Sequence, residues 1–154
     1  MEKKEICLQS FKEQNGTRFS FIAHQLDKYQ NTQLEQYGIT SKQAKILTFL
    51  YFNKDKNVSQ KDLEVFLSHT SSTITSILGN LEKNGFIVRY NSTDDGRAKC
   101  IVVTEKGNEV QDYIFESIRN CESIISKGIS EEEQKFLHSI LSKVCNNIKD
   151  IHGR

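Results

Sequence analysis

The stretch TSSTITSILGNLEKNGFIVRY, residues 70–90, changes its hydrophobic period partway along, and that change decides the fold. Up to Gly85 the apolar residues recur at helical spacing, with Ile74 and Leu81 on one face. Thr70 can cap the start of this helix, and Gly85 suits the left-handed turn in which many helices end. After Gly85 the pattern is that of a short strand. The stretch therefore predicts a helix followed directly by a β-hairpin.

Two shorter patterns upstream complete a three-helix unit. In ITSKQAKILTFLYF, residues 39–52, Thr40 precedes Gln43 by the three positions of a capping box. Ser59 and Asp62 repeat this spacing before a second helix. The buried edge of that second helix is expected to comprise Leu63, Phe66 and Leu67. Downstream of the third helix, the β-type runs FIVRY and KCIVV are joined by NSTDDGRA. Helix, short helix, helix and hairpin in this order are typical of a winged helix-turn-helix.

Amphipathic helical patterns flank this unit on both sides. The first covers residues of about 18–36. The second begins at Thr104 as a cap, continues to about residue 125 and resumes after Gly128 with Ser130 and Glu133 in a capping box. The central unit already has a core, so the apolar faces of the flanking helices are surplus. We expect them to pack against each other and against a second copy of the chain. The alternative is that they cover the core of their own chain.

The predicted fold class is mainly α with a small β-hairpin wing (α+β): a winged helix-turn-helix between N- and C-terminal dimerisation helices. The expected regions are an N-terminal dimerisation helix region (1–39), a winged helix-turn-helix domain (40–107) and C-terminal dimerisation helices (108–154). A chain of 154 residues suits one domain with such an extension.

Composition and charge narrow the function classes. At 36% hydrophobic and 27% charged residues, the chain resembles neither disordered nor membrane-embedded proteins. No apolar run approaches the roughly 18–20 residues that span a bilayer, and no secretory signal is visible, so we expect a cytoplasmic protein without a membrane partner. Residues 40–107 hold ten Lys/Arg against seven Asp/Glu. This mildly basic centre is compatible with binding a polyanion.

The sequence offers no catalytic or metal-binding constellation. The histidines are scattered, and none forms a nucleophile pattern with a cysteine or serine. GxGxxG, P-loop and HExxH motifs are absent, and the cysteines lack ligand spacing. We therefore expect no enzyme activity, no cofactor and no metal. Cys100, Cys121 and Cys145 are expected to pack as small apolar side chains.

The helix that starts at residue 71 carries an unusual concentration of hydroxyl groups. Its first turns contain Ser71, Ser72, Thr73, Thr75 and Ser76. Such residues are poor helix formers in this number. Hydroxyls and free backbone N–H groups at a helix start are, however, good partners for phosphates and base edges. A solvated polar face is the alternative, but a hairpin with a basic tip follows, and the combination favours DNA binding.

These residues resemble the MarR family of bacterial winged-helix regulators. The resemblance rests on SQKDLE, SSTIT, LEKNGFI, DDGRAK and VTEKG, which occur in the family's order and spacing. It implies a homodimer whose two lobes grip a double-stranded, pseudo-palindromic operator, with the helix from Ser71 in the major groove. It also implies that Arg97 at the wing tip enters the minor groove while Asp95 steadies the wing. The residues expected to contact DNA are Gln60, Lys61, Ser71, Ser72, Thr73, Thr75, Ser76, Arg89, Asp95, Arg97 and Lys99.

The sequence departs from the family in one respect. Many relatives carry arginine at the positions of Ser71 and Ser76, whereas the first exposed positions of this helix have no positive charge. Long-range attraction to DNA must then come from elsewhere. The candidates are Lys42, Lys45, Lys61, Arg89, Arg97 and Lys99.

The signal to which the protein responds is less specified. Family members commonly release DNA when a small, often aromatic ligand fills a pocket between the dimer helices and the winged lobe. The residues that could line such a pocket are His24, Tyr29, Tyr37 and Phe49, each of which is as readily a core or interface residue. Cys7 is the candidate thiol for a peroxide sensor, although it lies further upstream than the family's sensing cysteine.

The leading prediction is a sequence-specific, homodimeric transcriptional repressor that a small, often aromatic ligand releases from DNA. One alternative is a thiol-based redox-sensing repressor of the same family. The other is a winged-helix interaction module that never binds DNA. Such modules usually lose the basic wing tip and the polar helix face, and this chain retains both.

Overall fold

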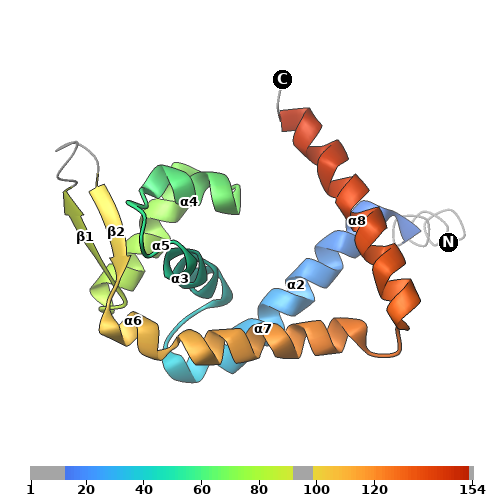
Figure 1. The fold of residues 1–154 in the computed structure, drawn as a ribbon, viewed down its shortest axis with the longest axis horizontal. Helices are drawn as coiled ribbons and strands as arrows, with labels where there is room; N and C mark the ends of the chain where they lie inside the picture. The colour runs from blue at the N-terminus through green and yellow to red at the C-terminus, as the bar shows by residue number, and fades with distance from the viewer. Residues whose placement is uncertain (1–12, 92–98, 153–154) are drawn as a thin grey trace, which may run out of the picture. The chain divides into compact units, whose positions relative to one another are not determined.

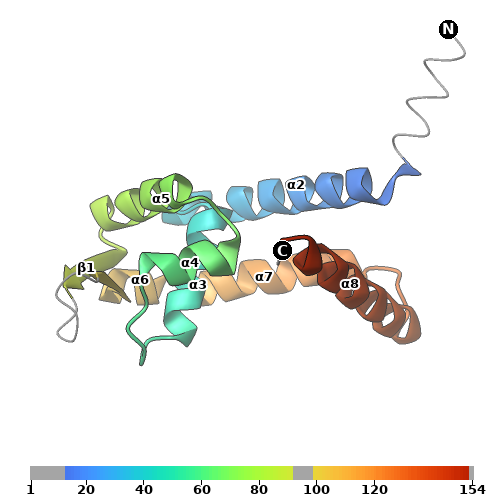
Figure 2. The ribbon, with the colours of Figure 1, turned by 90° about the horizontal axis from the view of Figure 1, so that it is seen from above.

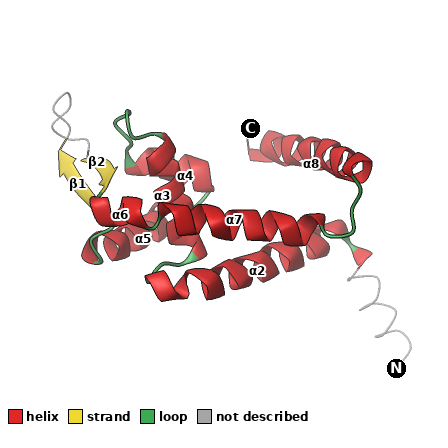
Figure 3. Ribbon diagram, turned by 60° about the horizontal axis from the view of Figure 1, so that its bottom comes forward, coloured by secondary structure: helices red, strands yellow, loops and turns green. Residues whose placement is uncertain are grey.

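The computed structural model describes residues 13–91 and 99–152. The elements in chain order are α2 (Asn15–Leu34), η1 (Glu35–Tyr37), α3 (Ser41–Phe52), α4 (Gln60–Leu67), α5 (Ser71–Lys83), β1 (Ile87–Asn91), β2 (Lys99–Val103), α6 (Glu105–Glu109), α7 (Gln111–Ser126) and α8 (Glu131–His152) (Figure 1). Among the described residues, β1 and β2 are the only strands (Figure 3). The chain divides into two compact units, residues 1–118 and 119–154, and α7 continues through the division. The predicted class, mainly α with a β-hairpin, is confirmed.

Helices α3, α4 and α5 begin at the predicted caps. At α3, the Thr40 hydroxyl accepts from Gln43 N, and Gln43 Oε1 in turn accepts from Thr40 N at 2.8 Å. At α4, Ser59 N donates to Asp62 Oδ2 at 2.8 Å to close a second capping box. The α5 cap is Thr70. Each cap satisfies backbone groups that a helix start leaves unpaired, so it fixes where the helix begins.

Left-handed residues follow two of these helices, one in the turn of the helix-turn-helix and one in the turn into the hairpin. Gly85, after α5, has a φ of +76° and sends the chain directly into β1. Ser68, between α4 and α5, has a φ of +51°, a backbone conformation that residues other than glycine adopt rarely. Beyond this turn, Gln60 at the start of α4 lies within hydrogen-bonding distance of Ser71 at the start of α5.

The hairpin is a regular antiparallel pair. Ile87 lies opposite Val103, and Asn91 lies opposite Lys99. Ile101 N also donates to Val58 O at 2.9 Å, which joins β2 to the segment leading into α4. Figures 1 and 2 show α6 beside the base of the hairpin. The connection that includes Asp95 and Arg97 lies outside the described residues.

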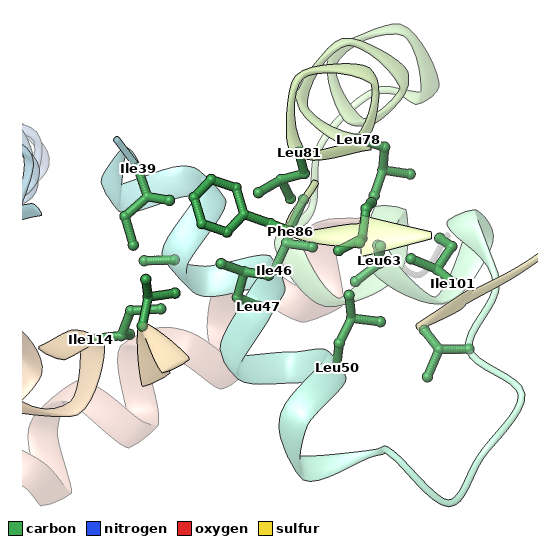
Figure 4. Close-up of a cluster of buried hydrophobic side chains, with 14 of the residues drawn as sticks. Ile39, Ile46, Leu47, Leu50, Leu63, Leu78, Leu81, Phe86, Ile101 and Ile114 are labelled. Atoms are coloured by element: carbon green, nitrogen blue, oxygen red, sulfur yellow. The ribbon is translucent and has the colours of Figure 1, made fainter. Parts of the chain in front are cut away.

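The core of the first unit lies where α3, α4, α5 and the hairpin meet (Figure 4). Its most deeply buried side chains are Leu34, Ile46, Leu47, Leu63, Ile74, Leu78, Leu81, Ile87 and Ile114. The expectation that Phe66 is buried is wrong, because its side chain is 52% exposed. Leu63 and Leu67 point toward the core from α4, whereas Phe66 turns to its edge and contacts the Phe49 ring at a centroid distance of 4.4 Å.

The helix expected from Thr104 is interrupted at Val110, which separates α6 from α7. The first turn of α6 is fixed on the end of α5 and the hairpin: Thr104 Oγ1 donates to Gly85 O at 2.6 Å, and Lys106 Nζ donates to Asn84 O at 2.8 Å. Gly107 lies directly against the backbone of Phe86. α7 begins directly after Val110, at Gln111.

The second unit consists of the end of α7 and α8. Gly128, with a φ of +77°, ends the first helix, and Ser130 with Glu133 closes the predicted capping box of the next. The apolar residues exposed on α8 are Phe136, Leu137, Ile140, Leu141 and Ile148. Cys145, expected to be packed, is also exposed, whereas Cys100 and Cys121 are buried as expected. No helix among residues 13–91 and 99–152 is long and apolar enough to cross a membrane.

Candidate nucleic-acid interface

The start of α5 presents the predicted hydroxyl groups. Ser71, Ser72, Thr75 and Ser76 are exposed, and Thr73 is half-buried. The Thr70 hydroxyl lies 3.1 Å from Ser72 Oγ and 2.9 Å from Thr73 Oγ1. These contacts order the first turn while leaving its outer side open. The resulting surface offers small hydrogen-bonding groups and no bulky side chain.

Gln60, the first residue of α4, joins this surface. Its Nε2 lies 2.9 Å from Thr75 Oγ1, 3.0 Å from Ser71 Oγ and 3.0 Å from Glu64 Oε1. Gln60 therefore connects the starts of both helices of the helix-turn-helix. Glu64 is a member of this cluster that the sequence analysis missed. Its position four residues after Gln60, on the same helical face, is the signal that could have found it.

The positive charges predicted around this surface fall into distinct environments. Lys61 is exposed on α4, and Lys99 is exposed at the start of β2. Lys45 forms an ion pair with Asp27 of α2, with a nitrogen–oxygen distance of 3.0 Å, so its charge is partly neutralised. Asp95 and Arg97 lie outside the described residues.

Arg89 of β1 is engaged with α5. Its Nε donates to Glu82 Oε2 at 3.0 Å, and its Nη2 contacts the same oxygen. These charge-assisted hydrogen bonds attach the base of the hairpin to the end of α5. The hydrogen bond from Arg89 lowers the pKa of Glu82 from its ordinary value of 4.5. Arg89 thus positions the hairpin, and Glu82 is a second participant that the sequence analysis missed.

This ion pair predicts an acid-sensitive contribution to stability. Because the pKa of Glu82 is lower in the folded than in the unfolded chain, the contribution is fully present above about 4.5 and is lost as the pH falls through the folded value. The free energies of unfolding of wild type and Glu82→Gln, measured with urea, should differ at neutral pH and converge as the pH falls below about 4.5. The other carboxylates titrate in both proteins, so the difference between the two free energies of unfolding reports on Glu82. A difference that stays constant with pH would contradict the role of the ion pair.

The candidate effector residues lie in separate environments. Tyr37 stacks on Tyr113 with ring centroids 4.0 Å apart, and burial raises its pKa. The Tyr29 hydroxyl accepts from Gln33 Nε2 at 2.6 Å, and Phe49 packs at the edge of the core. His24 lines an open hollow of about 780 Å³ between α2 and the start of α3. The structure therefore does not bring these four side chains to one cavity in the described part of the chain.

A small apolar cavity, which the sequence analysis did not identify, lies between α2, α3, α4 and α7. Its volume is about 110 Å³. Its apolar lining comprises Leu34, Ala44, Phe66, Ile114 and Ile118. Thr48 adds a hydroxyl, and the buried Gln111 donates to it at 3.3 Å. Gln111 Oε1 is buried and makes no hydrogen bond within the described residues. These groups come from distant positions, and no local pattern marks them.

Comparison with known proteins identifies relatives along most of the chain. A family model described as transcriptional regulator SarA/Rot matches residues 28–114. The HTH-type transcriptional regulator BilQ of Clostridioides difficile is 31% identical over 149 residues, which cover 92% of this chain and 94% of that protein.

Solved structures show the same fold. The S. aureus MepR–DNA complex superposes with a TM-score of 0.80 at 27% identity and covers 88% of this chain and 96% of that one. The transcription regulator MarR from Oenococcus oeni superposes with a TM-score of 0.71 at 30% identity and covers 86% of this chain and 99% of that one.

Proposed function

Because the chain belongs to the MarR family of winged-helix transcriptional regulators, we propose that it is a homodimeric repressor of a pseudo-palindromic operator. Binding of DNA as a transcriptional regulator, and not enzyme catalysis, is the function of this family. Beyond membership of the family, the proposal covers how the protein binds its operator, how the dimer forms and what releases the dimer from DNA. The observation that carries it is the hydroxyl-rich start of α5, ordered by Thr70 and Gln60 and open on its outer side.

The start of α5 enters the major groove in this proposal. Ser72, Thr73 and Ser76 contact base edges, while Lys61 and Lys99 meet phosphates on either side. Hydroxyl groups can donate or accept, so they suit several base edges. Two lobes of a dimer would reach half-sites roughly 34–36 Å apart, about one turn of B-DNA.

The apolar side chains exposed on α8 support the homodimer. Phe136 is 69% exposed and Ile148 is 51% exposed in the single chain, and α2 exposes Phe21 at 64%. Apolar surface exposed in this way on a helix is typical of an interface. A second copy would cover it, and a closed two-fold dimer would match a pseudo-palindromic DNA site. Binding to an operator on the chromosome places this activity in the cytoplasm.

The proposed signal that releases the protein from DNA is a small molecule of the class that includes aromatic ligands. The apolar cavity lined by Phe66, Ile114 and Ile118 supports this class of ligand, and the Thr48 hydroxyl supplies a polar group in its lining. No observation favours the redox alternative, which rests on Cys7, outside the described residues.

Replacing Arg97 by alanine tests the mode of binding. Loss of an arginine contact in the groove should weaken operator binding by about tenfold or more. Because α5 begins without positive charge, the affinity for non-specific DNA should be modest. Operator binding should depend heavily on Arg97. If Arg97 also neutralises one phosphate, the slope of log affinity against log salt should fall by about 0.9. Gel shifts on the DNA upstream of the gene, at several salt concentrations, measure both effects.

Lys135→Ala is the matched control, because Lys135 is an exposed residue of α8 and its loss changes the net charge equally. It should leave operator affinity nearly unchanged. Unchanged affinity in Arg97→Ala would contradict the wing contact. Failure of the wild-type dimer to bind any palindromic DNA at low salt would contradict the proposed function.

A further inference from the structure

Glu64 is an acidic residue within the surface proposed to face DNA. Its Oε1 lies 3.0 Å from Gln60 Nε2, and the side chain of Ser71 is a second hydrogen-bond donor to it. Hydrogen bonds from Gln60 and Ser71 lower the pKa of Glu64 from its ordinary value of 4.5. The carboxylate is therefore ionised at neutral pH, and it can only accept hydrogen bonds.

An ionised carboxylate at this position fixes the orientation of the Gln60 amide. If Oε1 of Gln60 turned toward Glu64, two acceptors would repel each other, so Nε2 must face inward. Nε2 has two hydrogens, and the oxygens of Glu64, Ser71 and Thr75 lie within 3.0 Å of it. Oε1 of Gln60 takes part in no hydrogen bond formed by the described residues. An acceptor is thus left on the outer side of the cluster.

Ser71 is constrained in the same way. Its oxygen accepts from Gln60 Nε2 at 3.0 Å, and the neighbouring ionised carboxylate of Glu64, which can only accept, favours a hydroxyl proton that points toward it. The remaining hydrogen-bonding capacity of Ser71 is a lone pair. Gln60 and Ser71 therefore both present acceptors, although each side chain could donate in another setting.

We propose that Glu64 is a positioning residue that sets the DNA sequence preference of the protein by holding the donors of Gln60 and Ser71 inward. The outward acceptors then select a base that carries an amino group, adenine or cytosine, in the major groove. The amino groups of adenine and cytosine are the major-groove donors, whereas guanine O6 and thymine O4 are acceptors that the outward oxygens of Gln60 and Ser71 repel. Phosphate oxygens are also acceptors, so the cluster selects bases and not the DNA backbone. The inference rests on the proposed entry of α5 into the major groove.

The test measures base preference and not affinity alone. Wild type, Glu64→Ala, Glu64→Gln and Gln60→Ala are each tested by competition against operators in which every position of a half-site is varied. Wild type should prefer adenine or cytosine by about tenfold at one position, the cost of one mismatched pair. Gln60→Ala should abolish that preference. Glu64→Ala should reduce it to less than about threefold, because the freed amide can present either its donor or its acceptor.

Two controls separate positioning from charge and from folding. Glu64→Ala removes a negative charge and should raise affinity for all DNA, so Asp55→Ala, an exposed acid in the loop before α4, provides the matched change. Asp55→Ala should leave the base preference intact. Glu64→Gln retains an acceptor oxygen and should keep most of the preference. Glu64→Leu, which removes both oxygens but keeps most of the bulk of the side chain, replaces Glu64→Ala if that variant does not fold, and it should lose the preference in the same way.

The outcomes distinguish this inference from the proposed function. Sequence-specific binding by wild type, with the same preference in Glu64→Ala, would overturn the role of Glu64 and leave the function standing. A preference for guanine or thymine at the Gln60-dependent position would also overturn it, as would equal relaxation at every position. Absence of any specific binding by wild type would overturn the proposed function and this inference together.

Discussion

Gly107→Ala is expected to lower the free energy of unfolding by about 3 kcal/mol, at the upper end of the effects of overpacking. An alanine methyl at this position would overlap Phe86 O and Val103 Cγ1. The Phe86 carbonyl cannot move freely, because it accepts from Thr104 N at 3.0 Å and lies at the start of the hairpin. Accommodation therefore requires α6 to move away from the hairpin, which would disrupt the hydrogen bonds of Thr104 and Lys106 to the end of α5.

Urea unfolding at a fixed protein concentration measures this loss, and Gly79→Ala provides the matched control. Gly79 lies in α5 with no atom within 4 Å of an added methyl. Its replacement should raise the free energy of unfolding by about 0.5–1 kcal/mol, because alanine favours the helix. The same change, glycine to alanine, should therefore lower the free energy of unfolding at position 107 and raise it at position 79. Similar effects of the two substitutions would contradict the close packing of Gly107.

Leu63→Ala is expected to lower the free energy of unfolding by about 2–5 kcal/mol, the range for truncating a buried leucine. Leu63 is 0% exposed and is the buried residue through which α4 joins the core. The remaining cavity would loosen the helix that carries Gln60 and Lys61. Operator affinity should therefore fall at temperatures where the variant is still mostly folded.

Val65→Ala, on the same helix, is the control for this substitution. Val65 is 72% exposed, so its truncation should change stability by no more than about 0.5 kcal/mol. Thermal and urea unfolding of both variants, with gel shifts at matched folded fractions, measure the contrast. Equal stability of the two variants would contradict the anchoring of α4 by Leu63.

The sequence predicts most of the fold because its main signals are local. Thr40, Ser59 and Thr70 cap helices through residues three positions away, so their spacing is visible in the chain itself. The change of period at Gly85 likewise locates the hairpin. Each of these features depends on a few neighbouring residues and not on the tertiary arrangement.

The features that the sequence leaves open depend on contacts between distant residues. The break at Val110 comes three residues after Gly107, which packs on the backbone of Phe86, 21 positions upstream. Phe66 is half-exposed at the edge of the core, where its ring contacts that of Phe49. Pairing of Arg89 with Glu82 needs the turn between α5 and β1 to bring both to one side. The positive charge of Arg89 suggested a contact with DNA, but nothing in the residue types indicated that Glu82 would pair with it.

The effector candidates illustrate the same limit within the site. Aromatic residues such as Tyr37 and Phe49 are suitable for lining a pocket, but their types are equally suitable for the core. Tyr37 stacks on Tyr113, more than 70 positions later, and Phe49 packs at the core edge. The cavity near Gln111 is assembled from four helices, so only the tertiary structure reveals it.

The hydrogen bond from Ile101 N to Val58 O has a consequence for cooperativity. It attaches the base of the wing to the residue just before the Ser59 cap, so one backbone contact serves both α4 and β2. Local opening of the wing base would expose this contact and release the α4 cap in the same event. The helix and the wing should therefore behave as a single foldon, whose amide hydrogens exchange with solvent together.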